Sequence, residues 1–118
     1  MRNTWEGTIG HVGRKTDDGR VIDSIFFDLH RGICPLIHGR DIVGTVDVVG
    51  VTAESEILAR GRTTLDSGEY IVWLSADGIL THEAEDGTSV ITEGRFVALT
   101  VDTKAAWPDT KITVKEGP

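Results

Sequence analysis

The sequence predicts an all-β fold, a small antiparallel β-barrel or sandwich of about eight or nine short strands. Two observations favour this class. Short runs rich in Val, Ile and Thr alternate with turns, and fourteen glycines and three prolines supply residues for those turns. No window of a dozen residues carries an apolar stripe at helical spacing. The best helical candidate is a single turn at 102–106, which Pro108 ends.

The expected strands follow one another along the whole chain. Each is an alternating or β-branched run bounded by turn residues. In chain order they cover residues 4–12, 21–27, 33–37, 42–51, 56–64, 69–75, 88–92, 95–101 and 111–115. The tip of the hairpin between the fourth and fifth strands is expected at 51–55. Asp77-Gly78 reads as a hairpin turn, and the acidic segment 80–87 reads as a solvated loop.

Length and charge restrict the organisation and the partners. A chain of 118 residues is expected to form a single all-β domain over 1–118. A formal net charge of −7 repels phosphate backbones, so no nucleic-acid partner is expected. No apolar run approaches 18 residues and no leader pattern is present, so we expect no membrane partner and no secretion signal. The lone Cys34 cannot form an internal disulfide, which fits a reducing cytoplasm.

A series of short motifs runs from the beginning of the chain to Gly61. It opens with Trp5-Glu6-Gly7 and continues with T-D-D-G-R at 16–20 and Pro-Leu-Ile-His at 35–38. It ends with V-G-T-V-D-V-V at 43–49 and an A-R-G strand that closes on Gly61. This order resembles the N-terminal β-barrel of the capsid maturation (prohead) proteases of tailed bacteriophages. The resemblance covers residues 5–61 only, and the rest of the chain does not follow the catalytic half of those proteases.

The resemblance supplies a conditional set of catalytic residues. His38 falls where those proteases carry their catalytic histidine, and Ser75 is the one serine in a comparable later strand. Asp41 or Asp77 would orient the imidazole. Only 13 residues separate Gly61 from Ser75, which leaves no room for the helix that precedes the family's serine. We therefore favour no catalytic residues and interpret His38 and Ser75 as loop and strand-end residues.

A metal or cofactor site is not expected. His30, Cys34 and His38 recur at four-residue spacing, which suits three ligands only on a helix, and Gly32, Pro35 and Gly39 interrupt such a helix. Cys34 is expected to be a buried small apolar residue. Gly7, Gly10 and Gly13 lack the strand–turn–helix context of a phosphate-binding loop, so no cofactor is predicted.

Three aromatic residues are the candidate binding residues. Strand alternation puts Phe26 and Phe27 on opposite faces, so the barrel interior takes only one of them. Trp107, beside Pro108, either caps the open end of the barrel or lies on a contact surface. We predict that a contact surface includes Trp107 and one of Phe26 or Phe27.

Three functions stay open. The resemblance implies a phage capsid-associated structural protein, a decoration or minor capsid protein that keeps the protease-like barrel. It would be made in the host cytoplasm and located in the virion, as a homo-oligomer with a trimer as one option. Its partner would be the major capsid protein or another virion protein. The alternatives are a minimal or degenerate capsid maturation serine protease and a generic β-barrel binding module unrelated to phage.

Overall fold

The computed structural model describes residues 2–23, 27–28, 33–101, 107 and 109–117. These residues form nine strands and no helix. The strands are β1 (Asn3–His11), β2 (Arg20–Ile22), β3 (Phe27–Asp28), β4 (Cys34–His38), β5 (Asp41–Val51), β6 (Glu56–Thr63), β7 (Gly68–Glu83), β8 (Ser89–Val101) and β9 (Lys111–Lys115). The predicted all-β class is confirmed, and the helical candidate at 102–106 lies outside the described residues.

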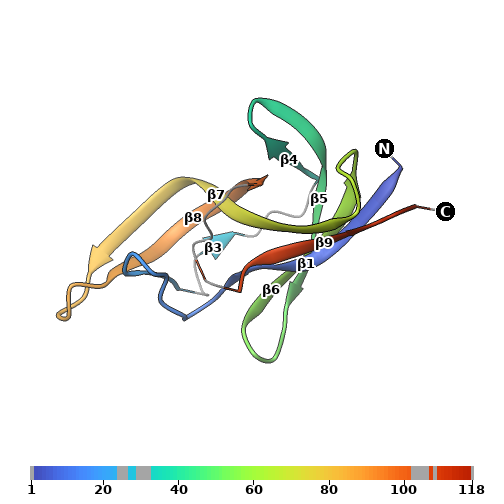
Figure 1. Cartoon of the computed structure of the whole chain (residues 1–118). Helices are drawn as coiled ribbons and strands as arrows, with labels where there is room; N and C mark the ends of the chain where they lie inside the picture. Colours follow the sequence, from blue (N-terminus) through green and yellow to red (C-terminus); the bar gives the residue numbers. More distant parts are fainter. Residues whose placement is uncertain (1, 24–26, 29–32, 102–106, 108, 118) are drawn as a thin grey trace.

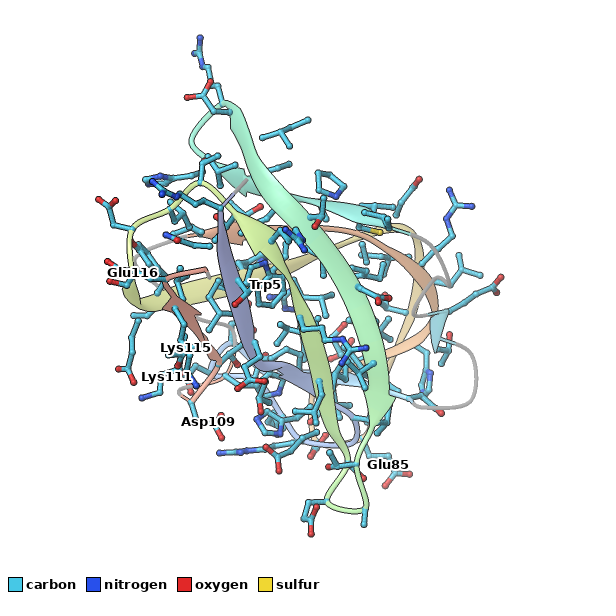
Figure 2. All side chains as sticks on the ribbon, turned by 90° about the vertical axis from the view of Figure 1, so that its right-hand side faces the viewer. Trp5, Glu85, Asp109, Lys111, Lys115 and Glu116 are labelled. Atoms are coloured by element: carbon cyan, nitrogen blue, oxygen red, sulfur yellow. The ribbon has the colours of Figure 1, made fainter. Side chains whose placement is uncertain are left out.

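Seven strands close into a barrel. The order of neighbours is β8-β4-β5-β6-β1-β9-β7, and β7 pairs with β8 again to complete the ring. Figure 2 looks onto the wall in which β9, β1, β6 and β5 lie side by side. Most neighbours are antiparallel, as predicted, but β2, β3 and β4 each pair with β8 in parallel. The fold is therefore a closed barrel with two further short strands, β2 and β3, added along β8.

Strand β8 is paired along both of its edges. One edge carries β7 from Val72 to Glu83, and the other carries β2, β3 and β4 in turn. The second half of β7 and the first part of β8, residues 77–95, form a hairpin that projects away from the barrel (Figure 1). We call this hairpin the arm. It contributes to the elongated shape of the molecule, 50 × 31 × 26 Å.

The arm is the main departure from the predicted strands. Residues 80–83 continue β7 instead of opening a loop, and the turn itself is limited to the residues around Gly87. Asp77-Gly78 is not a hairpin turn. Gly78 has a φ of 62°, but it lies inside β7 at a shift in the pairing register with β8. The predicted strands 88–92 and 95–101 are one strand, β8.

The predicted β5–β6 hairpin is confirmed. Its tip contains two backbone hydrogen bonds, from the Thr52 N–H to the Glu56 carbonyl and from the Ser55 N–H to the Thr52 carbonyl. Ser55 adopts the left-handed conformation, with a φ of 62°. The alternation predicted for β5 also holds on its inward side, where Gly44 and Val46 are buried.

The barrel interior is filled by large apolar side chains from most of its strands. Those with no exposed surface include Leu36, Val46, Ile57, Phe96 and Leu99. The wall near β1 is closed by a tryptophan. The indole N–H of Trp5 donates to the Thr45 carbonyl at 3.0 Å. A Cβ on Gly61 would lie 1.8 Å from that same oxygen, so glycine is required where β6 passes between them.

Candidate functional site

A cleft lies where the arm joins the barrel. Its volume is about 230 Å³, and its lining comes from β2, from residues 73–76 and Ile79 of β7, from Ile91 of β8, and from Thr16 and Trp107. Most of this lining is apolar or aromatic, and among the described residues that form it Arg20 is the one that carries a charge. We call this feature the cleft. It is smaller than the usual site for a drug-sized ligand, and its volume suits a group of the size of one side chain.

Arg20 is held over one wall of the cleft. Its guanidinium lies 5.3 Å from the centroid of the Trp73 ring, a cation–π arrangement. The carboxylate of Asp18 fixes the other side of this group, because the Arg20 Nε–H donates to it at 3.1 Å. Hydrogen bonds from the Thr16 hydroxyl and from Arg20 lower the pKa of Asp18. The lowered pKa favours the carboxylate form of Asp18, which is the acceptor that the Arg20 Nε–H meets.

A tight turn places Arg20 in this position. The backbone N–H groups of Thr16 and Arg20 point inward: the first donates to the Arg20 carbonyl at 2.7 Å, and the second to the Thr16 hydroxyl at 2.9 Å. Gly19 permits the turn with a φ of 83°. The T-D-D-G-R motif is thus a structural turn that presents its arginine to the cleft.

Trp107 forms a buried part of the cleft lining. Only 3% of its surface is exposed, and its indole N–H donates to the Arg14 carbonyl at 2.8 Å. The ring packs at 3.0 Å from the position that a Cβ on Gly10 would take. Of the two interpretations offered by the sequence, this geometry supports Trp107 as a cap on the barrel. Only a small part of Trp107 is exposed and the residue lines the cleft, so its part in a contact surface stays a prediction.

A polar cluster of His11, Arg14 and Asp109 lies beside the buried Trp107. His11, only 4% exposed, contacts the indole edge-to-face with 5.8 Å between ring centroids. Its Nε2 lies 2.9 Å from Asp109 Oδ1, and Arg14 Nη1 lies 3.2 Å from Asp109 Oδ2. Figure 2 places Asp109 just before the start of β9. Partial burial acts to raise the pKa of Asp109, but the His11 hydrogen bond and the charges of His11 and Arg14 outweigh it, and the pKa is lowered.

The other two candidate binding residues cannot be placed in the same way. Phe26 lies outside the described residues. The backbone of Phe27 belongs to β3 and pairs with Gly94 of β8, while its side chain lies outside the description.

The conditional catalytic residues are not brought together. Ser75 pairs with Ala98 on one edge of β8, and His38 pairs with Val101 on the other edge. Three residues along β8 correspond to about 10 Å, and two strand spacings to about 10 Å more in the perpendicular direction. Asp41 does pair with His38 across the β4–β5 hairpin. Ser75 nonetheless lies beyond the hydrogen-bond reach that a serine nucleophile and its base require.

The rejected metal site is also separated in space. Cys34 is buried, and burial raises the pKa of its thiol. His38 is exposed at the other end of the same strand, about 13 Å away for four residues of β structure. His30 lies outside the described residues. Across 2–23, 27–28, 33–101, 107 and 109–117, no three His, Cys, Asp or Glu side chains are grouped to hold a metal ion.

Comparisons with protein-family models, with curated proteins and with solved structures find no match to this chain. Within the described part of the chain, no helix has the length and apolar character needed to cross a membrane.

The sequence analysis gave neither Arg20 nor Trp73 a role in binding, although both line the cleft. They are 53 positions apart, and no local spacing links them. The available signal was chemical. Arginine and tryptophan are both residue types enriched at binding surfaces, and here the arginine ends an Asp-Gly turn while the tryptophan lies within a strand.

Proposed function

We propose that this chain is a non-catalytic assembly protein, a phage capsid-associated structural protein that binds the major capsid protein or another virion protein. Two independent considerations support the proposal. The motif series at 5–61 resembles a barrel from capsid biology. The molecule also carries a projecting structural element suited to binding a protein.

The arm is the observation that carries the proposal. Strand β9 covers the outer edge of β7 only from Gly68 to Ile71. Beyond Ile71, no described strand pairs with that edge, which continues to Glu83. Ile79 and Leu80 on this stretch are 44% and 57% exposed. A long free edge with exposed apolar side chains is a template for strand addition by a partner chain.

The position of the serine and histidine favours binding over proteolysis. Ser75 and His38 flank β8 on opposite edges, and Ser75 lines the cleft beside Trp73. A fluorophosphonate probe is therefore expected to leave the wild type unlabelled. Labelling that disappears in Ser75→Ala would support the protease alternative instead.

The test of the proposal uses the exposed apolar residues of the arm. Leu80→Arg is compared with Val49→Arg, since both side chains are 57% exposed but Val49 lies on β5, away from the arm. Each purified variant is mixed with expanded capsids of the encoding phage and co-sedimented. We expect binding by the wild type and by Val49→Arg, and loss of binding by Leu80→Arg with its Tm unchanged.

Two results would contradict the proposal. One is a wild type that neither sediments with capsids nor occurs in washed virions. The other is a gene whose neighbours encode no capsid or portal protein, which would favour a binding module unrelated to phage. Sedimentation of the free protein also tests the expected homo-oligomer and its trimeric option.

A further inference from the structure

The cleft meets β7 at an edge that no described strand occupies. Trp73, Leu74, Ser75 and Ala76 all line it, although successive residues of a strand point to opposite faces. Two features place four consecutive residues on one cleft: the edge of β7 carries no described strand beyond Ile71, and the register with β8 shifts between Ser75 and Ala76, which breaks the alternation of side chains. Backbone N–H and C=O groups at that edge are then available to an extended peptide.

The chemistry of the cleft specifies the side chains of such a peptide. Ile22 and Ile91 are 3% and 8% exposed, and together with Trp107 they give the cleft an apolar lining. A volume of about 230 Å³ suits one apolar side chain better than a cofactor. Arg20 adds a positive charge in a chain whose net charge is −7.

Asp18 bonds only one of the three nitrogens of the Arg20 guanidinium, Nε. It contacts the Nε edge, and among the described residues it is the one carboxylate within ion-pair distance of Arg20. The Arg20 side chain is 35% exposed. Its terminal nitrogens are therefore suited to a second carboxylate, with the Trp73 indole holding the guanidinium in place.

We propose that the cleft binds an extended peptide segment of a protein partner, with an apolar side chain in the cleft and, two residues along on the same face of the peptide, an acidic side chain on Arg20. The peptide backbone pairs with the free edge of β7 at 73–76. This inference rests on the proposed function for the identity of the partner as a virion protein. The peptide chemistry itself follows from the cleft.

The probe is the peptide acetyl-Thr-Leu-Thr-Asp-Thr-amide, in which Leu and Asp share one face of an extended chain, titrated into the full chain and followed by nuclear magnetic resonance. Two matched peptides carry Asn for Asp, which removes the charge, or Gly for Leu, which removes the apolar side chain. The indole N–H of Trp73 and the amides of 73–76 report the cleft. The indole N–H of Trp5, bonded to the Thr45 carbonyl, serves as an internal control.

We expect the Asp peptide to bind with a Kd in about the millimolar range, because a pentapeptide covers little surface. The Asn and Gly peptides should each bind about tenfold more weakly or worse. The Asp and Asn peptides should bind the Arg20→Gln variant with the same Kd. Arg60→Gln, which changes an exposed arginine on β6, should keep the difference.

Several results would overturn the inference. One is equal binding of the Asp and Asn peptides to the wild type. Another is chemical-shift changes that lie outside the cleft. The third is the absence of any chemical-shift change at 10 mM peptide, roughly ten times the expected Kd. If Arg20→Gln fails to fold, the wild-type comparison of the three peptides decides alone. If the peptide binds selectively but the protein does not associate with virions, the proposed function is refuted and the inference about the cleft stands. If the protein associates with virions but the peptides bind without selectivity, the inference about the cleft is refuted and the proposed function stands.

Discussion

Replacement of Trp107 by alanine is the sharpest test of how the cleft end of the barrel is built. The side chain is 3% exposed, contacts His11 edge-to-face, and donates to the Arg14 carbonyl at 2.8 Å. Truncating a buried tryptophan costs about 3–5 kcal/mol of unfolding free energy. The lost hydrogen bond to Arg14 is worth about 1 kcal/mol and is partly contained in that range.

We therefore expect Trp107→Ala to lose about 4 kcal/mol. For a chain of 118 residues, each kcal/mol lowers the Tm by about 4 °C, so the Tm should fall by about 16 °C. Calorimetry or circular dichroism measures this. Trp73→Ala is the matched control. Because Trp73 is only partly buried, the Tm of the Trp73→Ala variant should fall by less than half as much as that of Trp107→Ala.

A drop of less than about 4 °C in Trp107→Ala would refute the assignment of Trp107 to the core, since it corresponds to only 1 kcal/mol. If assembly were lost in that variant while the Tm stayed unchanged, Trp107 would be a contact residue after all.

Two further predictions concern the wall and the acidic residues. Gly61→Ala should destabilise the fold by about 2 kcal/mol or more, because its Cβ would lie 1.8 Å from the Thr45 carbonyl oxygen; urea unfolding with an unchanged midpoint would contradict this. The pKa values of Asp18 and Asp109 are lower in the fold than their ordinary value of 3.8. Both carboxylates therefore stabilise the fold above that pH and lose this contribution as the pH falls through their lowered values. Asp109→Asn should make the Tm less dependent on pH between 5 and 2, roughly the acid range in which a carboxylate titrates, and an unchanged pH profile would exclude its role.

The sequence predicted the barrel strands well where one face of a strand is buried. β5 and β6 alternate between core and solvent, and residues 51–55 are suited to a tight turn, so this hairpin was found with its tip. The arm was missed for the same physical reason. Residues 79–83 are exposed, so no apolar period marks them as a strand.

The cleft could not be predicted because its parts meet only through the topology. Parallel pairing of β2 with β8 brings Arg20 to the arm, and no local pattern indicates which strands pair across such a distance. His11 and Asp109 are likewise 98 residues apart. Their pairing depends on closure of the barrel between β1 and β9, which the sequence suggested only as a fold class.

The double pairing of β8 ties the arm to the barrel. A hairpin that merely extends from a domain can fray or swing while the rest stays folded. Here the strand that forms one side of the arm also closes the barrel at Leu99 and carries β2 on its other edge. A displacement of β8 within the arm would therefore also move β2, whose first residue is Arg20. A partner that binds the arm and shifts β8 is expected to change the position of Arg20 in the cleft as well.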